Sequence, residues 1–279
     1  MTIPKEVTES TFWTNTRDIL HFIGINGAGK TTLSNRLATR CERFGGKAIR
    51  TIDYHPHIPD NEHPDDRAFS RELDRLNNES GRNDSSIHQQ IVKHSLAQIE
   101  RWKTSDANVV VADRWYESYD GLPSACMDEI EAAIKASGFR LVRIFLLVSQ
   151  GLGDDAYSTV KHRLQQTKAQ RCESWCAEQD LEDLVREEMS YQEEYRQFCL
   201  SRAGKAPLLA RTTTWMQWDE YENWIADSLM HTQWFHDWQA WGNRRSAHGV
   251  PAPISLAHPD NPLVQEWNTL REDSCAANN

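Results

Sequence analysis

The chain of 279 residues is long enough for one large α/β domain with a well-buried core. Its 31 basic and 41 acidic side chains give a net charge of −10, which argues against a broad, non-specific nucleic-acid-binding surface. No segment approaches the roughly 18 apolar residues of a membrane span, and residues 1–10 lack the apolar core of a signal peptide. We therefore expect a cytoplasmic protein that makes no membrane contact.

Short apolar runs of strand length recur along the chain and are separated by segments with helical periodicity. The runs are 19–25, 47–53, 109–113, 141–148 and 207–213, and helices are expected at about 30–43, 86–102 and 217–230. Near-continuous apolar strands that alternate with amphipathic helices are typical of a parallel sheet covered on both faces. The pattern predicts an α/β fold in three layers around a five-stranded parallel sheet.

Two long polar sections interrupt this alternation. Residues 54–107 begin with a proline-containing stretch that indicates an irregular loop, whereas residues 154–200 are charged and have a helical pattern. Beyond residue 230, Trp234, Trp238 and Trp241 have the spacing of one helix face, which favours packing against the domain.

The sequence between the first strand and the first long helix, GINGAGKT at residues 24–31, fits the phosphate-binding pattern G-x-x-x-x-G-K-[ST]. Backbone N–H groups of such a loop, together with the following helix N-terminus, form an anion-binding concavity. Lys30 is expected to bridge the β- and γ-phosphates of ATP, and the Thr31 hydroxyl to bind Mg²⁺. The residues expected to contact the nucleotide here are Gly24, Asn26, Gly27, Ala28, Gly29, Lys30, Thr31 and Thr32.

A carboxylate follows the third strand. The run VVVAD places Asp113 at the C-terminal end of a buried strand, where open α/β sheets bind their ligands. Because a metal-bound triphosphate has to be held from a second side, Asp113 and Thr31 are the predicted metal residues.

Three motifs together resemble the thymidylate kinase family and the related deoxynucleoside kinases. They are GINGAGKTT, the segment DRWYES at residues 113–118, and a basic segment that ends in RCE at residues 171–173. The resemblance covers about residues 19–230. It implies a P-loop kinase fold over residues 1–230 with a helical lid at about 154–176, followed by a Trp-rich C-terminal extension at 231–279.

The resemblance also implies roles for individual residues. Arg114 would clamp the acceptor, and Tyr116 and Ser118 would lie near it. Positive charges on the lid would meet the negative charge that develops on the transferred phosphoryl group. These lid cations are Arg163, Lys168 and Arg171, of which Arg163 would contact the nucleotide and Arg171 would be catalytic.

The chain departs from the family after its second strand. Thymidylate kinases carry a motif like T-R-E-P-G-G there, whereas this sequence reads TIDYHPH, so Ile52 stands where the arginine that holds an acceptor phosphate would be. Asp53 keeps a carboxylate, and with Tyr54 it is a candidate acceptor residue. A hydroxyl acceptor must lose a proton, so Asp53 would suit the role of its base; a loop carboxylate without chemistry is the alternative.

Three functions fit these features. The first is an ATP-dependent kinase for a thymidine-like pyrimidine deoxynucleotide or nucleoside, as a homodimer if it follows the family. The second is a phage-type kinase that phosphorylates the hydroxymethyl group of 5-hydroxymethyl-deoxyuridine in DNA; the long insertion and the tryptophans would suit such an acceptor, while the net charge counts against it. The third is a P-loop regulatory NTPase without a metabolic acceptor, which the DRWYES segment and the basic lid disfavour.

Overall fold

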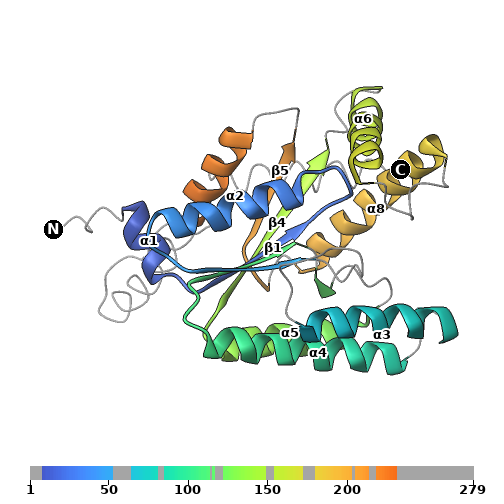
Figure 1. Cartoon of the computed structure of the whole chain (residues 1–279). Coiled ribbons are helices and arrows are strands. Elements are labelled where there is room, and N and C mark those ends of the chain that lie inside the picture. Colours follow the sequence, from blue (N-terminus) through green and yellow to red (C-terminus); the bar gives the residue numbers. More distant parts are fainter. Residues whose placement is uncertain are drawn as a thin grey trace, which may run out of the picture.

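The computed structural model describes residues 8–52, 64–80, 85–113, 115–116, 122–148, 154–171, 180–202, 205–213 and 218–230. Its centre is a sheet of five parallel strands in the order β2-β3-β1-β4-β5 (Figure 1). The strands are β1 (Asp18–Ile23), β2 (Ala48–Ile52), β3 (Val109–Asp113), β4 (Arg140–Val148) and β5 (Leu208–Thr213). The predicted α/β fold with a five-stranded parallel sheet is confirmed.

Strand β1 lies at the centre of the sheet, and all six of its residues are buried. It pairs with β3 on one side and β4 on the other, so the chain changes direction across the sheet at this strand. In the register of these pairs Phe22 lies beside Asp113, and Ile23 lies beside Phe145. The carboxyl ends of β1 and β3 therefore meet at one edge, which is where doubly wound sheets bind ligands.

One face of the sheet is covered by α1 (Glu9–Asn15), α2 (Lys30–Arg43) and the helix at residues 218–230 (Figure 1). Helix α2 has the bounds expected from the sequence, whereas α1 was not expected. Arg40 of α2 pairs with Glu9 of α1 and lies 3.3 Å from Glu222. Arg40 therefore links α2 to both α1 and the helix at residues 218–230.

The opposite face is covered by α3 (Pro64–Ser80), α4 (Ser85–Thr104) and α5 (Ser124–Ala136) (Figure 1). Helix α4 corresponds to the helix expected at 86–102. The stretch predicted as an irregular loop lies for the most part outside the described residues, and α3, which was not expected, begins at Pro64. Both α3 and α4 contribute to the apolar core on this face, so much of the long polar section is part of the domain.

Helices α6 (Asp154–Arg171) and α8 (Leu181–Arg202) lie side by side near the end of β4 (Figure 1). Helix α8 crosses from one layer to the other, because Leu184 packs into the core beneath α2 while Cys199 packs on the opposite face. Between these points the Gln192 side chain bonds both the N–H and the carbonyl of Val148, at 2.8 and 3.2 Å.

Helices α6 and α8 confirm the helical pattern of residues 154–200 wherever that section is described. The end of the expected lid, at 172–176, and the expected extension, at 231–279, lie outside the described residues. Within the part of the chain that the structure describes, no helix combines the length and the apolar character needed to cross a membrane.

Candidate active site

The glycine-rich loop connects β1 to α2, as the sequence predicts. Helix α2 begins at Lys30, and Gly29 before it adopts a left-handed conformation with φ 92°. The first N–H groups of a helix have no acceptor within the helix and carry the positive end of its dipole. The loop therefore ends in a site that favours an anion.

Two glycines let other elements approach the loop closely. A Cβ atom on Gly24, whose φ is +146°, would lie 2.5 Å from the carbonyl oxygen of Leu146 in β4. A Cβ atom on Gly29 would lie 2.5 Å from the indole ring of Trp218. Both positions favour glycine, because the loop is packed on β4 at its start and beneath Trp218 at its end, so a Cβ atom at either would force a neighbour to shift.

Lys30 is largely buried, with 6% of its surface exposed, and its side chain folds back along the loop. Its Nζ donates a hydrogen bond of 2.9 Å to the carbonyl oxygen of Ile25. The ammonium group is thus held against the loop that is expected to carry the phosphates.

The two predicted metal residues are in direct contact. The hydroxyl of Thr31, in the first turn of α2, donates a hydrogen bond to Asp113 at the end of β3. A hydroxyl and one carboxylate fit Mg²⁺, which usually keeps several waters and takes its remaining ligands from substrate phosphates. In the residues that the structure describes, no group of three or more His, Cys, Asp or Glu side chains forms a fuller metal site.

Arg163 of α6 brings the expected lid to the loop. Its Nη1 donates a hydrogen bond of 2.6 Å to the carbonyl oxygen of Gly27, and its guanidinium carbon lies 5.8 Å from the centre of the Trp218 ring. Burial lowers the pKa of the Arg163 guanidinium. The side chains of the other expected lid cations, Lys168 and Arg171, lie outside the described part of α6.

The sequence did not predict two residues that contact the loop, Glu188 and Trp218. The backbone N–H of Asn26 donates a hydrogen bond of 2.8 Å to the carboxylate of Glu188 in α8, and the Asn26 side-chain amide bonds the other oxygen of that carboxylate. Nothing in the acidic run around Glu188 distinguishes it from its neighbours. Trp218 belongs to a conspicuous group of tryptophans, but only the tertiary structure reveals its contact with the loop.

The segment after Asp113 is anchored in the protein interior by two aromatic side chains. The Trp115 indole N–H donates to Gln98 at 2.8 Å, and the completely buried Tyr116 donates its hydroxyl proton to Glu131 at 3.2 Å. The predicted contact of Tyr116 with substrate stays a prediction, because the contacts that the structure gives it are with the protein.

The other four predicted acceptor residues lie outside the described residues: Asp53, Tyr54, Arg114 and Ser118. Their neighbours in the chain show which part of the sheet they follow. Asp53 comes directly after Ile52, the last residue of β2, and Ile52 is the register partner of Asp113.

Comparison with known proteins gives little beyond this geometry. No family model matches the chain, and no curated protein sequence matches it. The chain is similar to the structure of shikimate kinase from Acinetobacter baumannii in complex with shikimate, with 14% identity, a TM-score of 0.43, and coverage of 80% of this chain and 98% of that one. It is also similar to the crystal structure of APE1195, with 10% identity, a TM-score of 0.40, and coverage of 77% and 96%.

Proposed function

We propose that the protein is an ATP-dependent kinase that transfers the γ-phosphoryl group to a thymidine-like pyrimidine deoxynucleotide acceptor. The observation that carries the proposal is the convergence of Lys30, Thr31, Asp113 and Arg163 on one glycine-rich loop. Phosphoryl transfer is catalysed mainly by positioning and by stabilising charge, and this set offers N–H donors, two cations and a metal-binding pair for that purpose.

The donor side follows from the contacts described above. The loop N–H groups and the start of α2 would hold the phosphates, with Lys30 and Arg163 as cations on either side. Thr31 and Asp113 would hold Mg²⁺, which neutralises phosphate charge when it is bound. Phosphate next to Arg163 would favour the charged guanidinium and so offset the effect of burial on its pKa.

The acceptor side rests on the resemblance of the DRWYES segment and on chain continuity. Arg114 is the residue after Asp113, so a clamp on the acceptor would stand directly beside the metal-binding carboxylate in the chain. In the sequence Asp53, the candidate base, comes directly after Ile52, the β2 residue that pairs with Asp113. This arrangement supports an acceptor site at the carboxyl ends of β2 and β3.

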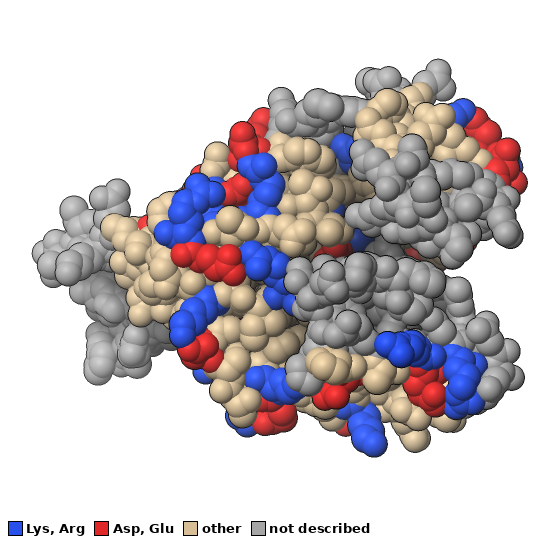
Figure 2. Space-filling model, in the orientation of Figure 1, with Lys and Arg blue, Asp and Glu red and all other residues tan. Residues whose placement is uncertain are grey.

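Two features favour a free nucleotide over a DNA-bound acceptor. Figure 2 shows basic and acidic side chains interspersed on this face of the molecule. Among the described residues, charged side chains also pair with one another, such as Lys47 with Asp106 and Arg50 with Glu42. A protein that binds the DNA backbone would instead gather basic side chains along a groove. The second feature is the long polar section at residues 54–107, which an enlarged acceptor was expected to require. Its helices α3 and α4 pack against the sheet and belong to the domain core.

The test is transfer of labelled phosphate from ATP to a panel of acceptors: dTMP, thymidine, 5-hydroxymethyl-dUMP and DNA that contains 5-hydroxymethyluracil. We expect label on a free nucleotide or nucleoside, and a rate about 10²–10³ lower for Lys30→Met, because a preorganised cation is lost. The matched control is Lys47→Met, which changes an exposed lysine just before β2 that pairs with Asp106 and not with the loop. Transfer to DNA alone would favour the phage-type function, and transfer to no acceptor would favour a regulatory NTPase.

Asp53→Asn distinguishes the two kinds of acceptor. If the acceptor is a hydroxyl, this variant should lose transfer because the proton has no base; if the acceptor is a phosphate, transfer should persist. Full activity of Asp53→Asn on a hydroxyl acceptor would eliminate Asp53 as the base.

A further inference from the structure

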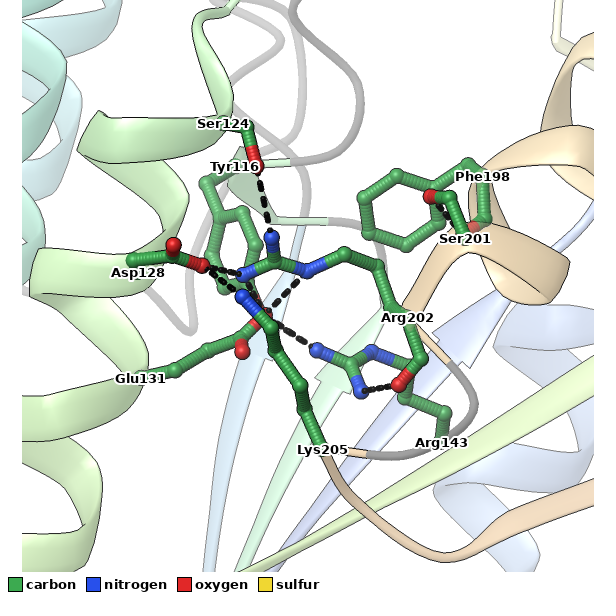
Figure 3. Close-up of polar contacts among 9 residues, drawn as sticks. All are labelled: Tyr116, Ser124, Asp128, Glu131, Arg143, Phe198, Ser201, Arg202 and Lys205. Carbon is green, nitrogen blue, oxygen red and sulfur yellow. Dashed lines mark hydrogen bonds and ion pairs between the residues drawn. The ribbon is translucent and has the colours of Figure 1, made fainter.

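A buried polar cluster lies behind the end of β3, on the side of the sheet covered by α5. Figure 3 shows four of its side chains pointing toward one another from separate parts of the chain: Tyr116 after β3, Glu131 of α5, Arg143 of β4 and Arg202 at the end of α8. We call these four residues the Glu131 cluster. Tyr116, Arg143 and Arg202 are each at most 2% exposed, so the cluster belongs to the interior.

One carboxylate oxygen collects the donors of this cluster. Glu131 Oε1 accepts a hydrogen bond of 3.2 Å from the Tyr116 hydroxyl and one of 3.0 Å from Arg202 Nε. Arg143 Nη2 also bonds this oxygen, and it lies 3.3 Å from the Tyr116 hydroxyl oxygen, to which it donates. Tyr116 is therefore held by a carboxylate that is itself fixed by two guanidinium groups.

The cluster is costly for the protein to bury. Each guanidinium loses much of its hydration, and apolar side chains of similar volume often stabilise a core as well or better. Two carboxylates face the two guanidinium groups, because Arg202 Nη2 lies 2.7 Å from both Glu131 and Asp128; Lys205 also pairs with Asp128. Burial alone would lower the pKa of Arg202, but these two carboxylates raise it. Such a cluster is best explained by a need for one defined geometry.

The part of the molecule whose geometry it defines is the chain that leaves β3. Trp115 is bonded to Gln98 of α4, and its ring packs against that of Tyr116 at 5.0 Å. His21 of β1 packs against both rings, at 5.9 and 5.3 Å. Both side chains that follow Arg114 are thus directed into the interior by α4, α5 and the central strands.

We propose that Glu131 and Arg143 are positioning residues, which act through the Tyr116 hydroxyl to fix the chain just beyond Asp113 and thereby the acceptor side of the site. The consequence for the acceptor rests on the proposed kinase function. The positioning of the chain by Tyr116 is independent of that function, since it follows from the contacts of Tyr116 with the protein.

The test is Tyr116→Phe, which keeps the packed ring and removes only the hydroxyl. Hydrogen–deuterium exchange of the protein without substrate should become about tenfold faster at the amides of residues 110–118, the factor expected for the loss of one hydrogen bond to a charged group. The matched control is Tyr191→Phe, which deletes a Tyr–Glu hydrogen bond of 3.1 Å on α8 outside the cluster. In this control, exchange at residues 110–118 should match the wild type.

Unchanged exchange at residues 110–118 in Tyr116→Phe would overturn the proposal, as would an equal increase throughout the protein. A second measurement uses the acceptor that the panel identifies: KM for that acceptor should rise about tenfold in Tyr116→Phe, while the Kd for ATP stays the same. Equal losses for acceptor and ATP would also overturn it, because they indicate general destabilisation. If no acceptor takes label, the kinase function fails and the exchange experiment still decides whether the cluster fixes the chain.

Discussion

The proposed donor side and the proposed acceptor side of the candidate site are built in different ways. On the donor side, one contiguous segment provides the loop, Lys30 and Thr31, and other elements add single contacts such as Arg163. On the proposed acceptor side, Tyr116 is held by the other members of the Glu131 cluster, which come from α5, β4 and α8.

The difference shows what each kind of chemistry demands of a fold. Phosphate binding needs backbone N–H groups that point into one concavity, and a short glycine-rich sequence before a helix can supply these groups by itself. A site for a particular acceptor needs side chains at particular places, and in the proposed site Tyr116 is held by contacts between distant elements. The two sides should therefore respond differently to substitution.

The largest effect is expected from Glu131→Gln, which removes the negative charge at the centre of the Glu131 cluster. It would leave two buried guanidinium groups around a neutral amide, and removal of one partner from a buried ion pair typically costs about 3–5 kcal/mol of unfolding free energy. Urea unfolding measures this cost. In the control Glu72→Gln, which affects an exposed pair with Arg75, the midpoint should not change. A midpoint for Glu131→Gln equal to that of wild type would show that the cluster carries no strong interaction.

A smaller effect is expected on the donor side from Gly24→Ala. The new Cβ would meet the Leu146 carbonyl at 2.5 Å in an unfavourable conformation, so we expect a loss of about 3 kcal/mol in unfolding free energy and weakened ATP binding. Gly138→Ala is the matched control, because Gly138 has a φ of +83° but nothing within 4 Å of its Cβ position; it should cost about 1 kcal/mol. Equal losses in the two variants would mean that the contact with β4 contributes nothing.

The smallest effect concerns Asp66, which lies away from both sides in the contact between α3 and α4. Its carboxylate lies 3.1 Å from His94 Nε2 and pairs with Arg101. Burial alone would raise the pKa of Asp66, but hydrogen bonds from His94 and Arg101 outweigh it and hold the pKa below its usual value. The stabilisation is then complete above the unfolded pKa of about 4 and is lost as the pH falls through the lower folded value.

Asp66→Asn should therefore lower the free energy of unfolding by about 1–2 kcal/mol at pH 7 and by less as the pH drops below about 4. Unfolding titrations of both proteins from pH 7 to pH 3 measure the difference, and ATP binding at pH 7 should be the same in both. A constant difference across this range would show that Asp66 gains nothing from its charge in the folded protein.

The sequence predicted those parts of the molecule that depend on local pattern. The five strands follow from their apolar runs, and the contact of Thr31 with Asp113 follows from the rule that parallel strands end at a common edge. Helix α3 could have been expected, since Phe69, Leu73 and Leu76 have helical spacing.

The contacts between distant residues could not be predicted in the same way. Arg143 interrupts an otherwise apolar strand, which indicates a buried partner, but no local pattern shows that the partner is Glu131. The same is true of Glu188, which reaches Asn26 from 162 residues away in the chain.

The position of Arg202 at the end of α8 has a consequence for the order in which the chain can fold. A growing polypeptide completes β1, the glycine-rich loop and α2 by residue 43, and Glu131 and Arg143 follow with α5 and β4. Arg202 is made 59 residues after Arg143. Until then Arg143 is the one cation of the cluster that is available to Glu131, and the partner that Arg202 provides for Asp128 is missing. The proposed acceptor side can thus reach its final form only late in synthesis, long after the glycine-rich loop has been made.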